Sequence, residues 1–104
     1  MAADAPLACT LTPDAYRRRL LDVAALSREA LRHVDQRGHI IDLRYAAEAV
    51  ERVRRFVDQE RACCGFLGFE LHERGDHVQV LVTVPPAARD AVPELLIELT
   101  GTAR

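Results

Sequence analysis

Hydrophobic and polar residues alternate with two different periods along this chain, and each change of period predicts a new element. Thr12, Pro13 and Asp14 mark the start of a helix, because the hydroxyl caps free amides and proline suits the first turn. This helix is expected to run to about His33, with Gly38 beyond it as the stop. The residues that recur in this segment at the spacing of a helix are Tyr16, Leu20, Val23, Ser27, Leu31 and Val34.

A period of two residues, typical of strands with one buried face, appears in three later segments. Ile41, Leu43 and Tyr45 define one strand. Residues 69–72 and 78–84 define two more, and the turn residues 74–76 between them predict a β-hairpin. The short apolar stretch 7–11 is predicted as an additional edge strand.

The period of a helix returns after residue 46 and again after residue 85. The inward stripe of the second helix comprises Ala49, Val53, Phe56, Val57, Glu60, Cys63 and Cys64, and Gly65 ends it. Pro85 and Pro86 open a last helical segment that Pro93 interrupts. The order β-α-β-α-β-β-α predicts an α+β fold with an antiparallel or mixed four-stranded sheet and helices on one face. The other sheet face could support a homodimer.

The length and the charge of the chain limit the classes of protein to which it is expected to belong. A chain of 104 residues is expected to form a single domain, 1–104, with residues 1–6 outside the ordered fold. The net charge of −2 and the mixing of 14 basic with 16 acidic residues argue against nucleic-acid binding. We expect the run Arg17–Arg19 to be solvated. No apolar run approaches the length of a membrane span and no secretory pattern precedes the fold, which favours a cytoplasmic protein.

Glu60 is the most informative residue for function. Its place on the inward stripe means that a carboxylate must be desolvated or partnered. Cys63 and Cys64 follow at i+3 and i+4, so the carboxylate could ligate a metal with the thiols or accept a thiol proton. The alternative is that Glu60 is structural, capping a strand or pairing with an arginine such as Arg44.

The three cysteines suit a reducing compartment, because an odd number fits a disulfide framework poorly. An adjacent pair favours ions that prefer thiolate, such as Zn, Hg, Cu, Cd or As species, and Cys9 could supply a third sulfur. The partial negative charge at the end of a helix and the carboxylate of Glu60 both disfavour a bare thiolate. A bound cation reverses that penalty, so metal binding is better supported than an unusually reactive thiol.

The segment Glu60-Arg61-Ala62-Cys63-Cys64-Gly65-Phe66-Leu67-Gly68-Phe69 resembles a family of small uncharacterised bacterial proteins, and the resemblance covers most of the chain. Its pattern is Glu-x-x-Cys-Cys followed by Phe-Leu and an aromatic residue, with an early Cys-x-Leu that corresponds here to Cys9. Many members have Pro or Ala at the position of Gly65. The association of this family with heavy-metal resistance neighbourhoods implies metal handling.

Three hypotheses follow. The first is binding of a soft metal or metalloid by Cys63 and Cys64, with Cys9 or Glu60 completing the ligand set. The second is a small cysteine-dependent enzyme that acts on a thiol-reactive ligand, with catalytic residues Glu60, Cys63 and Cys64 and Glu60 as proton shuttle. The third is a structural or interaction module in which the cysteines only pack.

Overall fold

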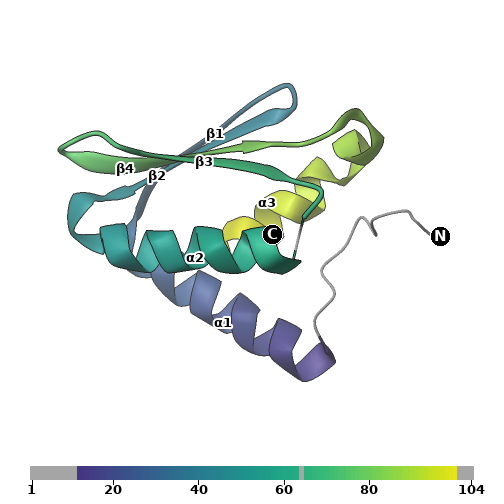
Figure 1. The fold of residues 1–104 in the computed structure, drawn as a ribbon, viewed down its shortest axis with the longest axis horizontal. Helices are drawn as coiled ribbons and strands as arrows, with labels where there is room; N and C mark the ends of the chain where they lie inside the picture. Colours follow the sequence, from purple (N-terminus) through teal and green to yellow (C-terminus); the bar gives the residue numbers. More distant parts are fainter. Residues whose placement is uncertain (1–11, 64, 101–104) are drawn as a thin grey trace.

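The computed structural model describes residues 12–63 and 65–100, which form three helices and four strands (Figure 1). The chain enters α1 (Pro13–Ala30) and continues through β1 (Leu31–Arg37) and β2 (Ile40–Ala46). A 3₁₀ turn, η1 (Ala47–Ala49), leads into α2 (Val50–Cys63). The second half comprises β3 (Gly68–Glu73), β4 (His77–Thr83), a second 3₁₀ segment η2 (Pro86–Ala91) and α3 (Val92–Thr100).

The four strands form one antiparallel sheet in the order β1-β2-β4-β3. Each half of the chain supplies one hairpin, and β2 and β4 join the hairpins in the centre. Figure 1 shows the three helices on the same side of the sheet, with α2 running along it and α1 slanting away toward its amino end. The prediction of an α+β fold with helices on one face of a four-stranded sheet is confirmed.

The predicted order of the elements is wrong within the described residues. The observed order is α-β-β-α-β-β-α, whereas the hydrophobic pattern predicted β-α-β-α-β-β-α. The predicted first strand, at residues 7–11, lies outside the described residues. The four strands of the sheet therefore include one that the sequence analysis did not predict.

The unpredicted strand is β1, which begins where the first helix was expected to continue. Leu31 and Val34 are three residues apart, a spacing that fits the turn of a helix. In the structure they lie opposite Tyr45 and Leu43 of β2, and the register shifts between Leu31 and His33. Backbone hydrogen bonds to β2 outweigh the local preference, and no pattern within residues 31–37 encodes those bonds.

Two glycines close the two hairpins. Gly38, expected to stop a helix, instead lies between β1 and β2 with φ of 61°. Gly75 lies between β3 and β4 with φ of 88°, as the turn predicted at residues 74–76 requires. A side chain at such positive φ costs about 1 kcal/mol or more, so glycine suits both turns.

The core lies between the sheet and the helices. Alternate residues of the central strands are buried, among them Ile41, Leu43 and Tyr45 on β2, as the two-residue period predicted. Leu95 and Leu99 of α3 are buried with them. The remaining buried apolar side chains of these strands and of α2 are Val53, Phe56, Val57, Val78, Val80 and Val82.

Helix α1 begins as predicted but turns a different face inward. Thr12 is its N-cap, and the Thr12 hydroxyl accepts a hydrogen bond of 3.2 Å from the backbone amide of Ala15. The buried residues of α1 are Arg19, Val23, Leu26 and Ala30, whereas the predicted stripe ran through Leu20, Ser27 and Leu31. The inward face is thus shifted by one residue over much of the helix, and an arginine lies on it.

Within the described ranges, 12–63 and 65–100, no helix is both long enough and apolar enough to span a membrane.

Candidate functional site

The inward face of α2 carries Glu60 into the core. Val53, Phe56 and Val57 are buried on this face, and Glu60 is only 1% exposed. The backbone of Cys63 ends α2 one turn later, and the described chain resumes at Gly65 in a turn before β3. The prediction that Glu60 lies inward is therefore confirmed. The side chain of Cys63 and all of Cys64 and Cys9 lie outside the described part of the structure.

The partner of Glu60 is Arg19 of α1, which is 4% exposed. The guanidinium Nη1 of Arg19 donates a hydrogen bond to Oε2 of Glu60, and the two groups form an ion pair. The expectation that the run Arg17–Arg19 is solvated is wrong for its last residue. A buried charge requires a partner, and the carboxylate of Glu60 provides it.

Two further residues complete a polar cluster that connects all three helices. Glu98 of α3 places Oε1 3.7 Å from Nη2 of Arg19, an ion-pair distance too long for a hydrogen bond. The hydroxyl of Tyr16 donates a 3.1 Å hydrogen bond to Oε2 of Glu98. The guanidinium carbon of Arg19 also lies 5.3 Å from the centroid of the Tyr16 ring, within the range of a cation–π contact.

Burial dominates the electrostatics of this cluster. It raises the pKa of the Glu60 carboxyl above its usual value, although the charge and hydrogen bond of Arg19 act in the opposite direction. Burial also raises the pKa of Tyr16, and the hydrogen bond to Glu98 acts in the same sense. The guanidinium of Arg19 lies against the Glu60 carboxyl, so the negative charge of Glu60 is largely compensated.

Tyr45 approaches the cluster from the sheet. Its ring packs at a tilt against Phe56, with 6.3 Å between the centroids. Burial raises the pKa of the Tyr45 hydroxyl far above its usual value, with a smaller contribution from the charge of Glu60. The hydroxyl has no hydrogen-bond partner among the described residues, so Tyr45 stays neutral and serves mainly as a packing residue.

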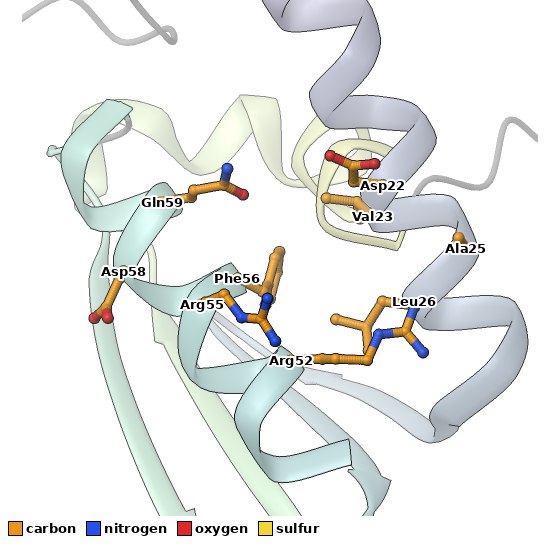
Figure 2. Close-up of a pocket in the computed structure, with 9 residues that line it drawn as sticks. All are labelled: Asp22, Val23, Ala25, Leu26, Arg52, Arg55, Phe56, Asp58 and Gln59. Carbon is orange, nitrogen blue, oxygen red and sulfur yellow. The ribbon is translucent and has the colours of Figure 1, made fainter.

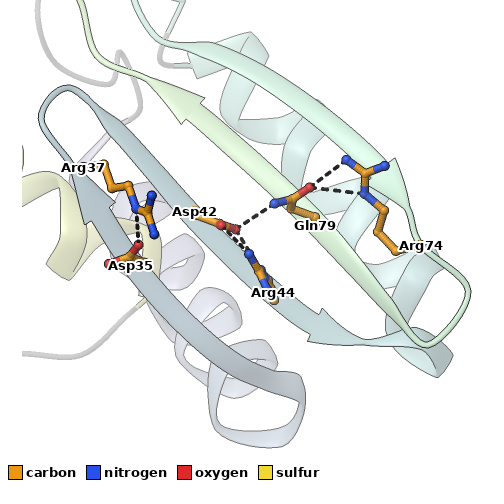
Figure 3. Close-up of polar contacts among 6 residues, drawn as sticks. All are labelled: Asp35, Arg37, Asp42, Arg44, Arg74 and Gln79. Carbon is orange, nitrogen blue, oxygen red and sulfur yellow. Dashed lines mark hydrogen bonds and ion pairs between the residues drawn. The ribbon is translucent and has the colours of Figure 1, made fainter.

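Arg44, the arginine suggested as a partner for Glu60, lies on the opposite face of the sheet and pairs elsewhere (Figure 3). Its Nη2 donates a 2.9 Å hydrogen bond to Asp42 of the same strand. Gln79 of β4 donates to Asp42 as well, at 3.2 Å. Arg44 does not pair with Glu60 because neighbouring side chains of a strand point to opposite faces of the sheet, and its neighbour Tyr45 points inward.

Arg19, Tyr16 and Glu98 were not predicted from the sequence as members of the site. One signal for Arg19 was available: positions 16, 19, 23, 26 and 30 follow the alternating three- and four-residue spacing of an inward helical stripe. An arginine on that stripe predicts a buried acidic partner. The sequence offers no comparable signal for Glu98, which reaches the cluster from the last helix.

No group of three histidine, cysteine, aspartate or glutamate side chains within residues 12–63 and 65–100 is arranged to hold a metal ion. Comparison with known proteins gives no match, whether to the models of protein families, to curated proteins or to solved structures.

Proposed function

We propose that the protein binds a soft metal or metalloid ion through the thiolates of Cys63 and Cys64, with Cys9 as the third sulfur ligand. The cysteine pair comes where α2 ends and the chain turns toward β3. Adjacent residues within a helix diverge by about 100°, so a junction of helix and turn suits two neighbouring thiols better than a helix interior. Ions such as Zn(II), Hg(II), Cu(I) and As(III) prefer this type of ligand.

The observation that carries the proposal is the pairing of Glu60 with Arg19. A free carboxylate one turn before Cys63 would oppose thiolate formation, in addition to the negative end of α2. With Arg19 against Glu60, that local negative charge is compensated.

The same contact changes the expected role of Glu60. Oε2 accepts a hydrogen bond from Arg19, and the side chain is almost fully buried. A carboxylate held in this way links α1 to α2 and is poorly placed to ligate an ion as well. We therefore assign the third ligand to Cys9 and give Glu60 a positioning role at the end of α2.

The burial of Glu60 also weakens the interpretation as a cysteine-dependent enzyme. A proton shuttle must exchange protons with both the reacting thiol and water. Glu60 is 1% exposed, and the guanidinium of Arg19 occupies one of its oxygens. The interpretation as a module with packed cysteines remains the main competitor, and metal uptake separates it from the proposal.

Native mass spectrometry of the full chain, purified under reducing and chelator-free conditions, tests the proposal. Zn(II), Hg(II), Cu(I) or As(III) is added to the wild type, to Cys63→Ala/Cys64→Ala and to Cys9→Ala. We expect uptake of one ion by the wild type, none by the double variant, and weaker As(III) uptake by Cys9→Ala, because that variant lacks one of the three proposed sulfur ligands. Glu60→Gln is the matched control and is expected to retain the ion.

Two results would contradict the proposal. Equal uptake by the wild type and the double cysteine variant would show that the pair is not the site. Loss of the ion from Glu60→Gln, with the fold intact by circular dichroism, would make Glu60 a ligand and remove its assignment as a positioning residue.

A further inference from the structure

Helices α1 and α2 run antiparallel and are joined by ion pairs at two levels, with a groove between them. Arg19 contacts Glu60 at one end of the groove. At the other end, Nη1 of Arg52 lies 2.6 Å from Oε1 of Glu29. Between these pairs the helices leave a groove with a volume of about 520 Å³ (Figure 2).

The groove has an apolar floor and charged residues on both walls, and the α2 wall carries Asp58 as well as its arginines. Asp58 forms an ion pair with Arg61 of the same helix. Figure 2 shows Val23 and Leu26 projecting from α1 toward Phe56 of α2. Asp22 stands on the α1 side and Arg55 on the α2 side. No hydrogen bond or ion pair joins either of these two side chains to another described residue. Both charges are therefore available to a partner.

An exposed leucine lies beside the groove. Leu21 is 67% exposed, the highest value among the large hydrophobic side chains of the described residues. Ala25, one turn later on α1, lines the groove. Residues at i and i+4 lie on the same side of a helix, so Leu21 extends the apolar surface of the groove along α1.

We propose that this groove is a self-association surface, occupied by α1 of a second copy of the chain in antiparallel orientation. The ion pairs at the two ends of the groove place Ala25 about level with Arg55. A twofold axis near residues 23 and 24 of α1 then sets Leu21 of one copy on Ala25 and Leu26 of the other. The same arrangement brings Asp22 of each copy to Arg55 of the other.

The chemistry of the groove favours a second copy over other occupants. A twofold interface requires a surface that is complementary to itself. The groove surface carries the projecting side chain of Leu21 and the apolar floor on which Leu21 of a second copy would pack. It also carries one unpaired charge of each sign, Asp22 and Arg55. The open face of the sheet is a weaker candidate, because its charges at Asp42 and Arg44 are already paired within the chain.

Sedimentation velocity over a range of concentrations up to about 1 mM, where even a weak dimer is half formed, provides the first test. We expect the wild type to dimerise and Leu21→Asp to raise the dimer Kd by about 100-fold, because two leucines lose their burial at once. Val34→Asp is the matched control: Val34 is exposed on β1, away from the groove, and its replacement is expected to leave the Kd unchanged.

A mixing experiment tests the contact between Asp22 and Arg55. The variant Asp22→Arg alone brings two positive charges together at each of the two contacts, and Arg55→Asp alone brings two negative charges together. Each variant is therefore expected to be monomeric. In a mixed dimer, one contact joins the two substituted side chains, whose charges are opposite, and the other contact joins the two native ones. We therefore expect the two variants, mixed in equal amounts, to form a heterodimer.

Circular dichroism of each variant is the control for an intact fold. A wild type that stays monomeric up to about 1 mM would overturn the proposal and leave the groove to another occupant. So would a dimer that Leu21→Asp does not weaken, since it would form through another surface such as the sheet. Failure of the mixed variants to associate would overturn the antiparallel arrangement. None of these results depends on metal binding by the cysteines.

Discussion

Arginine–carboxylate pairs occur on both sides of the sheet in this protein, and their surroundings differ. On the helical side, Arg19 and Glu60 are removed from water between three helices. On the open side, Arg44 and Asp42 form a similar pair at the surface, where Arg44 is 42% exposed (Figure 3). Both pairs consist of a guanidinium and a carboxylate, so a difference in their contributions to the free energy of unfolding reflects the difference in burial.

Burial makes the inner pair important for stability once it has formed. Removing one partner leaves an uncompensated charge in the core, whereas water solvates a charge left on the open face. The inner pair also joins two residues of different helices that are 41 positions apart in the chain, while Arg44 and Asp42 are two residues apart on one strand. The inner pair therefore depends on the complete fold, and the outer pair depends on one strand.

Arg19→Ala is expected to have the largest effect. It leaves Glu60 buried without its cation, and we expect the free energy of unfolding to fall by about 3–5 kcal/mol, measured by urea denaturation. Arg19→Met combined with Glu60→Leu is the matched control. It removes both charges, and we expect it to recover most of the loss. A loss below about 1 kcal/mol for Arg19→Ala would mean that the pair is solvated in solution.

The pH dependence of stability is expected to differ in sign between the two carboxylates. The raised pKa of Glu60 means that the folded state keeps a proton which the unfolded state releases. The resulting stabilisation is complete below the usual carboxyl pKa of 4.5 and is lost as the pH rises through the raised pKa. Relative to Glu60→Gln, the wild type should therefore become less stable over this interval, by about 1.4 kcal/mol for each unit of pKa shift.

Asp42 should show the opposite trend. Burial acts to raise its pKa, but the hydrogen bonds from Arg44 and Gln79 outweigh burial and lower it. Its contribution is present above the usual pKa of 3.8 and is lost as the pH falls through the lowered value. Urea denaturation of the wild type, Glu60→Gln and Asp42→Asn at a series of pH values measures both trends. Equal signs would show that the two environments are not electrostatically different.

Tyr16→Phe is expected to have an intermediate effect. The substitution removes the hydrogen bond to Glu98 and keeps the ring that packs over Arg19. We expect a loss of about 1 kcal/mol in the free energy of unfolding. Thermal denaturation of this variant beside Glu98→Gln measures it, and a loss equal to that of Arg19→Ala would indicate that Tyr16 itself holds the buried charge in place.

Arg44→Ala is expected to have the smallest effect on the free energy of unfolding, below that of Tyr16→Phe, because water solvates the pair it breaks. About 1 M salt should remove most of this difference by screening, as measured by urea denaturation at low and high salt. The same salt concentration should leave the loss caused by Arg19→Ala nearly unchanged. A salt-resistant effect of Arg44→Ala would contradict the contrast between the two pairs.

Local patterns in the sequence correctly predicted those helices and strands in which the buried residues recur at the period of the element itself. The hairpin of β3 and β4 is one case, because strict alternation and a glycine turn act within 16 residues. The inward position of Glu60 is another, because the stripe through Val53 and Phe56 extends directly to it. The cap at Thr12 is also local, since its hydroxyl bonds an amide three residues away.

The candidate site was only half predictable. The hydrophobic pattern of α2 predicted that Glu60 lies inward. The partner suggested from the sequence was Arg44, however, and Arg19 was expected to be solvated. Arg17, Arg18 and Arg19 are chemically identical, and the helical stripe that contains Arg19 competes in the sequence with the stripe through Leu20 and Ser27. The packing of α1 against α2 and α3 selects the stripe with Arg19. A pattern that is shifted by one residue turns a helix by about 100°, enough to exchange an outward for an inward position.

The amino-acid sequence by itself determined the α+β class, the second hairpin, the inward face of α2 and the presence of a carboxylate on it, because each of these depends on neighbours within a few residues. Tertiary structure alone decided that residues 31–37 form a strand, because their hydrogen-bond partners belong to β2. It also decided that Glu60 pairs with Arg19 and that Glu98 joins them from α3. Burying a charge is favourable only beside a partner, and the complete packing of the helices brings these partners together.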